Sequence, residues 1–346
     1  MTKPIILVAG GMGYIGSHTV VELINAGYEA LIVDNLSNSN LGVLDGIEAI
    51  TGTRPEFIKA DCADLDAMCS IFASHPAIAG VIDFAASKAV NESVHKPLLY
   101  YRNNIVSLLN LLECINDAPE CSGIVFSSSC TVYGEPDTNP VTEKSPIKPA
   151  TSPYGNTKQI SEDIIRDTVA AGTGFNAILL RYFNPVGAHP SALIGELPNG
   201  VPQNLIPYLT QTAIGIRKQL SVFGNDYPTP DGSCIRDFID ITDLARAHVT
   251  AVERIVNKGM DERVEVFNLG TGHGVSVLEL INTFEKATGV KVPYTIAPRR
   301  EGDIIQVWAD PSKANKVLGW KAETPLEQTM LNAWHWQQHL RKTGVM

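Results

Sequence analysis

The chain has 346 residues, enough for one large core or two joined lobes, and its net charge of −10 argues against non-specific nucleic-acid binding. No apolar run reaches the ~18 residues of a membrane span, and residues 1–5 lack the segments of a signal peptide. The six cysteines form no C-x-x-C pair, as expected for free thiols in a reducing compartment. We therefore expect a soluble, cytoplasmic protein with no membrane partner. His335 and His339 lack the Glu and third ligand of a zinc helix, so no metal site is predicted.

The first predicted strand, residues 5–8, leads into a glycine-rich turn and then a helix that ends near Asn25. Gly10, Gly13 and Gly16 form a shifted version of the dinucleotide-binding fingerprint. Glycines at these places allow a tight turn, close approach of a pyrophosphate, and close packing of the helix on the strand. A glycine turn without a ligand is the alternative, and the strand–turn–helix context disfavours it.

A second predicted strand, residues 30–33, ends in Asp34, where the fingerprint requires an acid that binds the adenosine ribose. Its carboxylate would repel the 2′-phosphate of NADP, and residues 35–40 contain no Lys or Arg to neutralise one. We therefore predict NAD as the cofactor. The expected contacts from these first two strand ends are Gly10, Gly13, Tyr14, Ile15, Gly16, Asp34, Asn35 and Asn38.

Two further strands, residues 56–59 and 81–84, are predicted to end at the same edge of the sheet. Asp61 would contact the adenine, although it could instead cap the next helix, a role that Asp64 could fill equally well. Small residues after the second of these strands let a cofactor lie close. Lys88 could contact a phosphate or the nicotinamide carboxamide, or could be a solvated side chain. The expected contacts here are Asp61, Cys62, Phe84, Ala85 and Lys88.

The pair Tyr154 and Lys158 shares one face of a predicted helix that continues to about residue 171. A free phenol ionises near pH ~10, and an adjacent ammonium lowers that pKa, which makes the phenol a usable base near neutral pH. Ser129 follows the predicted strand 124–126 and could stabilise a substrate oxygen beside the phenol. The alternatives are a solvated helix face and a turn serine.

A sixth predicted strand, residues 177–182, completes a βα alternation typical of a Rossmann-type doubly wound parallel sheet, within an α/β fold. Beyond it the chain predicts a smaller mixed α/β lobe that binds the substrate. We assign residues 1–184, with about 235–270, to the cofactor-binding domain, and 185–234 with 271–346 to this lobe. Predicted elements there include a helix over 204–219 and capping boxes that begin at Ser276 and Thr324.

Arginines and amides are the notable polar residues of this second part. Arg236, Arg299 and Arg300 carry planar guanidinium groups that match phosphate oxygens, although a surface ion pair is the alternative for each. Asn184 and Asn204 offer amides to sugar or phosphate oxygens. A helix over residues 97–116 also carries Asn103 and Asn104, either of which could be structural.

Taken together, these stretches resemble the UDP-glucose 4-epimerases of the extended short-chain dehydrogenase/reductase group, from residue 5 to about 336. The matching stretches are residues 10–18, 88–90, 127–134, 181–188 and 299–303. The resemblance implies tightly held NAD, Tyr154 as base, Lys158 as modifier of its pKa, and Ser129 as hydroxyl partner. It implies interconversion of UDP-galactose and UDP-glucose through a 4-keto intermediate, and a homodimer formed by helices 97–116 and 154–171, although amphipathic helices alone would look the same in a monomer.

The resemblance also assigns binding residues. Lys88, Asn103 and Phe183 would line the cofactor and sugar, together with Tyr154 and Lys158. Those expected around the UDP-sugar are Lys88, Ser129, Tyr154, Asn184, Asn204, Phe223, Arg236, Arg300 and Asp303.

Val307 is the position where the family's side chain sets substrate range. A bulky Tyr there tends to exclude 2-acetamido sugars, and a small residue tends to admit them; Trp308 fixes the register. We therefore expect UDP-N-acetylhexosamines as additional substrates, unless residues 304–306 refill the space. Ala9, Ala86, Ser87 and Cys130 depart from the family pattern without removing a catalytic group.

Two other functions remain open at this point. A nucleotide-sugar 4,6-dehydratase of the same fold would carry an Asp-Glu pair near the serines, and residues 129–132 contain no carboxylate. A non-catalytic NAD-binding regulator would have lost the Tyr, Lys or Ser, and all three are present.

Overall fold

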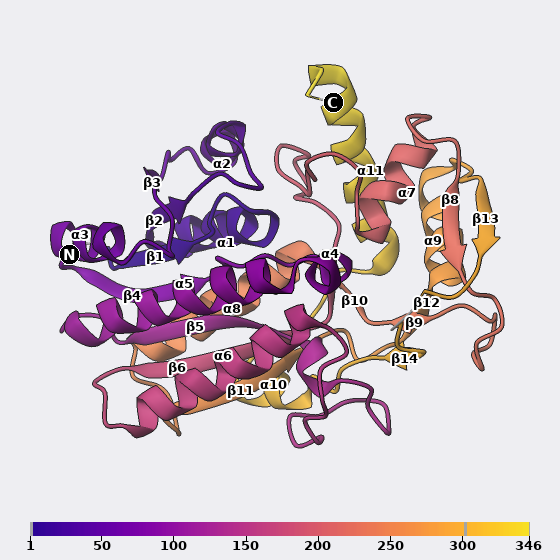
Figure 1. Cartoon of the computed structure of the whole chain (residues 1–346). Coiled ribbons are helices and arrows are strands. Elements are labelled where there is room, and N and C mark those ends of the chain that lie inside the picture. Colours follow the sequence, from indigo (N-terminus) through magenta and orange to yellow (C-terminus); the bar gives the residue numbers. More distant parts are fainter. Residues whose placement is uncertain (1–2, 301–302, 346) are drawn as a thin grey trace.

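A seven-stranded parallel sheet forms the centre of the protein in the computed structural model, which describes residues 3–300 and 303–345 (Figure 1). The strand order is β11-β6-β5-β4-β1-β2-β3, and every neighbouring pair is parallel. Its strands are β1 (Ile5–Ala9), β2 (Glu29–Asp34), β3 (Glu56–Lys59), β4 (Ile78–Asp83), β5 (Gly123–Ser129), β6 (Asn176–Tyr182) and β11 (Val264–Leu269).

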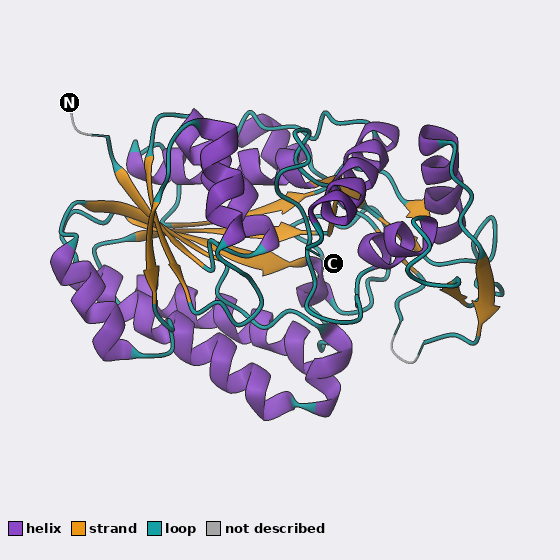
Figure 2. Cartoon of the chain, turned by 90° about the horizontal axis from the view of Figure 1, so that it is seen from above, coloured by secondary structure: helices purple, strands orange, loops and turns teal. Residues whose placement is uncertain are grey.

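Helices cover both faces of this sheet, as Figure 2 shows. Side chains alternate between the two faces along each strand, so Ile6 and Val8 belong to one apolar cluster and Leu7 to the other. The first cluster includes residues of α1 (Tyr14–Asn25), α2 (Gly42–Thr51), α8 (Ile241–Val256) and α10 (Ser312–Val317). The second includes residues of α3 (Leu65–Ser74), α5 (Pro97–Asp117) and α6 (Pro153–Ala170). The Rossmann-type α/β class predicted from the sequence is confirmed.

A second, smaller set of helices and strands lies beyond the carboxyl ends of the central strands (Figure 1). It has its own apolar cluster, which includes Leu209, Val222, Phe284 and Met330. Its helices are α7 (Leu205–Ala213), α9 (Val277–Thr288) and α11 (Leu326–Thr343). Its short strands are β8 (Leu220–Phe223) with β13 (Tyr294–Ala297), and β12 (Val275–Ser276), β9 (Ile235–Arg236) and β14 (Gln306–Val307). A further pair, β7 (Asn184–Val186) with β10 (Phe238–Asp240), connects this set to the central sheet.

Two local predictions need correction, and one is confirmed. The helix expected over 204–219 ends at Ala213, because the chain turns through Gly215, whose φ is +87°. Thr324 is not a cap: Pro325 is the N-cap of α11 and has no polar side-chain atom, while the Thr324 N–H donates to Asp243 Oδ2 at 2.8 Å. The capping box of Ser276 is present as predicted.

A buried ion pair fastens α6 to the sheet. Arg181 of β6 donates from Nε to Glu162 Oε1 at 2.8 Å, and its Nη2 lies 2.5 Å from Oε2. Ser128 Oγ donates to the same carboxylate at 2.6 Å. Burial raises the pKa of Glu162, but Arg181 and Ser128 outweigh burial and hold that pKa below its usual value. The pair therefore fixes α6 at a set height above β5 and β6.

We predict that Glu162→Ala lowers the free energy of unfolding by about 3–5 kcal/mol, because it leaves the Arg181 charge buried without its partner. Because the pKa of Glu162 is depressed in the fold, its stabilisation is present above the unfolded pKa and is lost as pH falls. Urea unfolding at several pH values measures both effects.

Arg166→Ala is the matched control. Its Nη2 is 3.5 Å from Glu162 Oε2 and its side chain is 41% exposed, so the loss should stay within about 1 kcal/mol. Equal losses in the two variants would refute the assigned anchoring role.

Candidate active site

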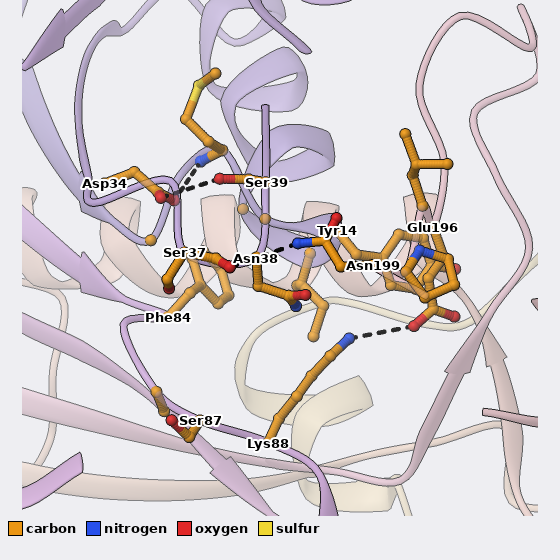
Figure 3. Close-up of a pocket in the computed structure, with 18 of the residues that line it drawn as sticks. Tyr14, Asp34, Ser37, Asn38, Ser39, Phe84, Ser87, Lys88, Glu196 and Asn199 are labelled. Atoms are coloured by element: carbon orange, nitrogen blue, oxygen red, sulfur yellow. Dashed lines mark hydrogen bonds and ion pairs between the residues drawn. The ribbon is translucent and has the colours of Figure 1, made fainter. Parts of the chain in front are cut away.

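A cavity with a volume of about 1270 Å³ lies at the carboxyl ends of the central strands. One wall comes from the segments that follow β1, β2 and β4, and the opposite wall from residues 193–204 and α11. Figure 3 shows Asp34 and Phe84 on the first wall and Glu196 and Asn199 on the second. A ligand in this cavity would therefore touch both parts of the chain, as ligands do in open α/β sheets.

The glycine turn after β1 cannot accept side chains at two of its positions. Gly10 has a φ of +74°, and a Cβ there would lie 2.8 Å from the carbonyl carbon of Phe84. A Cβ at Gly16 would lie 2.4 Å from Gly10 O. At Gly13, which lines the cavity as the N-cap of α1, the nearest such contact is 3.2 Å. The turn thus presents bare backbone at a helix N-terminus, which is the arrangement that binds a diphosphate.

Asp34 ends β2 and holds the next loop in place. Its carboxylate accepts hydrogen bonds from Met12 N at 3.1 Å, Leu36 N at 2.8 Å and Ser39 Oγ at 3.1 Å. Figure 3 shows Asp34 beside Ser39, with Ser37 and Asn38 also on this wall of the cavity. The side chain is only 9% exposed yet lines the cavity, so it can accept from a ribose hydroxyl there.

The contacts of Asp61 and Asp64 show which of them caps the helix after β3. Asp64 is the N-cap of α3 and accepts from Ala67 N at 3.1 Å, so Asp61 does not cap that helix. Asp61 instead accepts from Asn35 Nδ2 at 3.2 Å and faces the cavity. The predicted cofactor residues that line the cavity are Gly10, Gly13, Tyr14, Ile15, Gly16, Asp34, Asn35, Asn38, Asp61, Cys62, Phe84, Ala85, Lys88, Asn103, Tyr154 and Lys158. Phe183 is absent from the described lining and is buried instead near Val307.

The two asparagines of α5 differ in their contacts. Asn104 is buried and donates to Thr157 Oγ1 at 3.1 Å, so it ties α5 to α6. Asn103 lines the cavity and donates to Ser87 Oγ at 3.2 Å. Asn104 is therefore structural, whereas Asn103 faces the ligand space.

Tyr154 and Lys158 are buried on the inner face of α6, with 8% and 4% of their surfaces exposed, and both line the cavity. The helix begins at Pro153 with Ser152 as N-cap, whose Oγ accepts from Gly155 N at 3.1 Å. Ser129, at the end of β5, hydrogen-bonds the Tyr154 phenol. A solvated helix face, the alternative left open by the sequence, is thereby excluded.

The electrostatics of this pair differ from the expectation. Burial raises the pKa of Tyr154, and Tyr182 adds to the increase, while the Ser129 hydrogen bond opposes it. The Lys158 ammonium donates to the Ser127 carbonyl at 2.6 Å. Burial lowers the pKa of Lys158 to about 8, and Asp83 and Glu162 oppose the decrease. Tyr154 is thus a buried acid and Lys158 a buried cation, and neighbouring groups influence the protonation state of each.

The arginines predicted to bind substrate form two contacts in the second part of the chain. Arg236 Nη2 lies 3.8 Å from Asp303 Oδ1. The Arg300 guanidinium lies over the Phe223 ring, 4.1 Å from its centre. Arg299 donates from Nε to Asp226 Oδ1 at 2.8 Å, which is the surface ion pair considered as its alternative. Residues 301–302 of the matching stretch 299–303 lie outside the described residues.

Val307 is 3% exposed and pairs with Arg236 in the β14–β9 register. It packs in one apolar cluster with Phe183, and Cys130 and Ile304 pack against that cluster. Cys130 directly follows Ser129, so Val307 lies near the Tyr154 end of the site. Of the predicted substrate residues, those in the described cavity lining are Lys88, Tyr154 and Asn204; those outside it are Ser129, Asn184, Phe223, Arg236, Arg300, Asp303 and Val307.

Three residues at the site were not predicted. Glu196 accepts from Lys88 Nζ at 3.2 Å (Figure 3). It also accepts from Asn204 Nδ2 at 2.6 Å, so it joins two residues that were predicted to bind the substrate. The Tyr182 hydroxyl hydrogen-bonds Ser127 Oγ beneath Tyr154. Asp83 ends β4 inside the protein. The sequence contained a signal for Asp83, because an acid at the end of an apolar strand is unusual. Glu196 lies in a Gly- and Pro-rich loop, where no neighbouring residue indicated a role in the site.

Comparisons with known proteins agree with this geometry. Residues 7–332 match the family model described as GDP-mannose 4,6 dehydratase. A UDP-glucose 4-epimerase of Bacillus subtilis is 52% identical over 332 residues, which cover 96% of each chain. The chain belongs to the UDP-glucose 4-epimerase family.

Solved structures of this epimerase family share the whole fold. The UDP-glucose 4-epimerase of Stenotrophomonas maltophila, solved with bound NAD and formylated UDP-arabinopyranose, superposes with a TM-score of 0.93 at 47% identity and covers 98% of this chain and 99% of its own. The UDP-Glc/GlcNAc 4-epimerase of Campylobacter jejuni superposes with a TM-score of 0.82 at 36% identity, over 97% of this chain and 99% of its own. Within the described residues, no helix is long and apolar enough to cross a membrane.

Proposed function

We propose that this protein interconverts UDP-galactose and UDP-glucose by 4-epimerisation, with NAD held in the central cavity. The observation that carries the proposal is the buried pair of Tyr154 and Lys158 in the cavity lining, with the buried Ser129 beside the Tyr154 phenol. The 52% identity to an epimerase, over nearly the whole length of both chains, supports the same reaction.

The residues present fit NAD. The bare glycine turn offers backbone N–H groups to a diphosphate, and Asp34 offers a carboxylate to ribose hydroxyls. No Lys or Arg occurs in residues 35–40, so a 2′-phosphate would find no counter-ion beside Asp34. The chemistry that NAD supplies when bound is reversible hydride transfer at C4 of the sugar.

Side chains of the protein transfer the proton of the sugar 4-hydroxyl. Tyr154 accepts the proton of the sugar 4-hydroxyl and later returns it to the same oxygen, while Ser129 stabilises that oxygen by a hydrogen bond. Burial keeps the phenol protonated, so Tyr154 needs a nearby positive charge to act as a base. Lys158, one turn along α6, is the cation placed to supply it.

The site should bind the nucleotide end of the substrate tightly and the sugar loosely. The 4-keto sugar has to turn so that either of its faces can be presented to the cofactor. We assign the UDP portion to Arg236, Arg300, Asp303, Phe223, Asn184 and Asn204, and the sugar side to Lys88, Ser129, Phe183 and Val307. The Arg300–Phe223 contact and the Arg236–Asp303 pair support an anion site there.

We assign NAD and the UDP-sugar to different residue ranges of the chain. Residues 1–184 and about 235–270 would bind NAD, since β11 and α8 complete the central sheet and its helical layer. Residues 185–234 and 271–346 would bind the UDP-sugar, since α7, α9 and α11 share an apolar cluster of their own. Ala314 of α10 packs instead in the cluster of the central sheet.

A 4,6-dehydratase activity is the second candidate, because the matching family model carries that description. Elimination of water needs a further acid–base pair. η1 (Cys130–Tyr133), which follows Ser129, contains no carboxylate. Epimerisation is therefore favoured.

A homodimer and a cytoplasmic location complete the proposal. Leu98, Ile105 and Leu109 lie on one side of α5, and Leu98 and Leu109 are 78% and 40% exposed. This side would pack against a second copy beside α6. All six cysteines are free, which supports a reducing compartment, and cell fractionation tests that location.

We predict that the protein sediments as a dimer and that Leu109→Glu shifts it to a monomer, because a buried unpaired charge opposes association. Analytical ultracentrifugation measures this. Glu113→Gln, at an already polar position of α5, is the control. A parent chain that sediments as a monomer would refute the dimer.

We predict conversion of UDP-galactose to UDP-glucose without added NAD, and at least a ~10²-fold lower kcat in Tyr154→Phe, the low end for a general acid–base group. The variant should keep its fold and its NAD, measured after acid release. Tyr101→Phe is the control, because the Tyr101 hydroxyl of α5 accepts from Asn156 Nδ2 of α6 at 2.6 Å and lies outside the described cavity lining. No conversion by the parent, or near-normal turnover in Tyr154→Phe, would overturn the proposal.

We also predict that the parent epimerises UDP-N-acetylglucosamine and that Val307→Tyr loses this activity while retaining the UDP-glucose reaction. Val307 is small and lies beside Phe183 and Cys130, where a phenol ring would take up space near the sugar. The alternative is that Ile304, which packs against the same cluster, refills that space. The turnover of both substrate pairs, measured in the parent and in Val307→Tyr, distinguishes these alternatives. The UDP-glucose reaction is the internal control. A parent inactive on the acetamido sugar contradicts the assignment.

A further inference from the structure

The mechanism above leaves one buried carboxylate beside the site without a role. Asp83 is the last residue of β4 and is 4% exposed. Its strand lies between β1 and β5, where Asp83 pairs with Ala9 and Phe126. The Ala85 N–H donates to Asp83 Oδ1 at 2.9 Å and fixes the carboxylate at the strand end. A charge in this position needs a counter-charge.

Asp83 and Lys158 lie on the same face of the sheet. Val81, two residues earlier, belongs to the apolar cluster under α3, α5 and α6, so Asp83 points to that side. Phe126, its partner on β5, belongs to the same cluster, and Lys158 Nζ lies 4.6 Å from the Phe126 ring centre. The carboxylate and the ammonium therefore lie on the same side of the sheet, where they interact electrostatically.

The titratable groups around this pair come from five elements. Asp83 interacts with Lys158 of α6, Tyr182 of β6 and Cys62 after β3. Lys158 interacts with Asp83 of β4 and with Glu162 on its own helix. Tyr154 lies one turn before Lys158, and its phenol interacts with Tyr182, Cys130 after β5, and Tyr100 of α5. Glu162 is already engaged by the Arg181 guanidinium, so Asp83 is the carboxylate left to balance Lys158.

We infer that Asp83 is a positioning residue for catalysis: its carboxylate keeps the buried Lys158 ammonium charged and oriented, and thereby keeps Tyr154 usable as a base. This inference rests on the proposed epimerase function and assigns a role within that same site.

The protonation of both groups is consistent with this role. Burial lowers the pKa of Lys158 to about 8, against an increase caused first by Asp83. Burial raises the pKa of Asp83 to about 6, against a decrease caused first by Lys158. Both groups are therefore charged between about pH 6 and 8. Above that window Lys158 loses its proton, and the support that it gives to a phenolate is lost.

Asp83→Asn tests the inference in the NAD-loaded enzyme. The amide keeps the size of the side chain but removes the charge, so the pKa of Lys158 should fall. The alkaline decrease of kcat should then move to lower pH by about one unit or more. Lys158→Met removes the partner, and in that background Asp83→Asn should cause no further shift.

Asp240→Asn is the matched control. Burial also raises the pKa of Asp240 to about 6, but its carboxylate accepts from Thr242 N at 2.8 Å and Thr329 Oγ1 at 2.9 Å, in contacts that do not involve Lys158. This variant should keep the alkaline decrease at the parent's pH, even if its stability changes.

Thermal unfolding gives a readout that is independent of activity. A lysine whose pKa is lowered by folding contributes a stability that increases as pH rises through its folded pKa, because the unfolded chain then binds more protons. In the parent this increase should begin near pH 8, and in Asp83→Asn it should begin at lower pH.

The outcomes separate the inference from the function on which it rests. A parent without epimerase activity would overturn the proposed function. An active parent whose pH profiles of kcat and of unfolding are unchanged in Asp83→Asn would overturn the role of Asp83, even if the variant were less stable or slower at every pH. A shift of both profiles to lower pH supports it.

Discussion

A positive charge held inside the protein is the constraint on which the site depends. An ammonium loses its hydration when buried, and this cost is offset only by carboxylates, carbonyls or aromatic faces at fixed distances. Lys158 meets all three, with the Ser127 carbonyl at 2.6 Å, the Phe126 ring at 4.6 Å and Asp83 as an electrostatic partner. Each of these contacts requires α6 to lie at one height and one rotation above β4 and β5. The position of α6 therefore determines the environment of the Lys158 charge.

The helix is accordingly tied down at several points. Ser152 caps its first turn, Asn104 holds Thr157 from α5, and the Glu162–Arg181 pair joins its middle to β6. The Arg181 guanidinium also donates to the Tyr133 hydroxyl at 3.0 Å, which links this anchor to the segment after β5. The polar groups of α6 that face the sheet are thus engaged one after another. A buried polar network of this kind specifies one geometry because any partly satisfied alternative leaves a charge without a partner.

The sequence predicted those parts of the site that depend on local chemistry. Glycines 10, 13 and 16, Asp34 and the pair Tyr154 and Lys158 are recognisable from spacing alone, because the turn, the strand end and the helix face determine their positions. What it missed depends on contacts between distant segments. Glu196 meets Lys88 across 108 residues, and Asp83 of β4 interacts electrostatically with Lys158 of α6. Nor did the sequence show that burial by the whole fold raises the pKa of Tyr154.

Val307 occupies a short strand whose pairing does not involve its side chain. The register of β14 with β9, Gln306 to Ile235 and Val307 to Arg236, is made by backbone groups. The side chain at this position can therefore be exchanged while the strand continues to hold Arg236 beside Asp303. Under the proposed assignment, a substitution at residue 307 would change the sugar preference and leave the residues assigned to the nucleotide in place. The substrate range of a protein with this fold would then evolve by point mutation, without rebuilding the part assigned to the nucleotide.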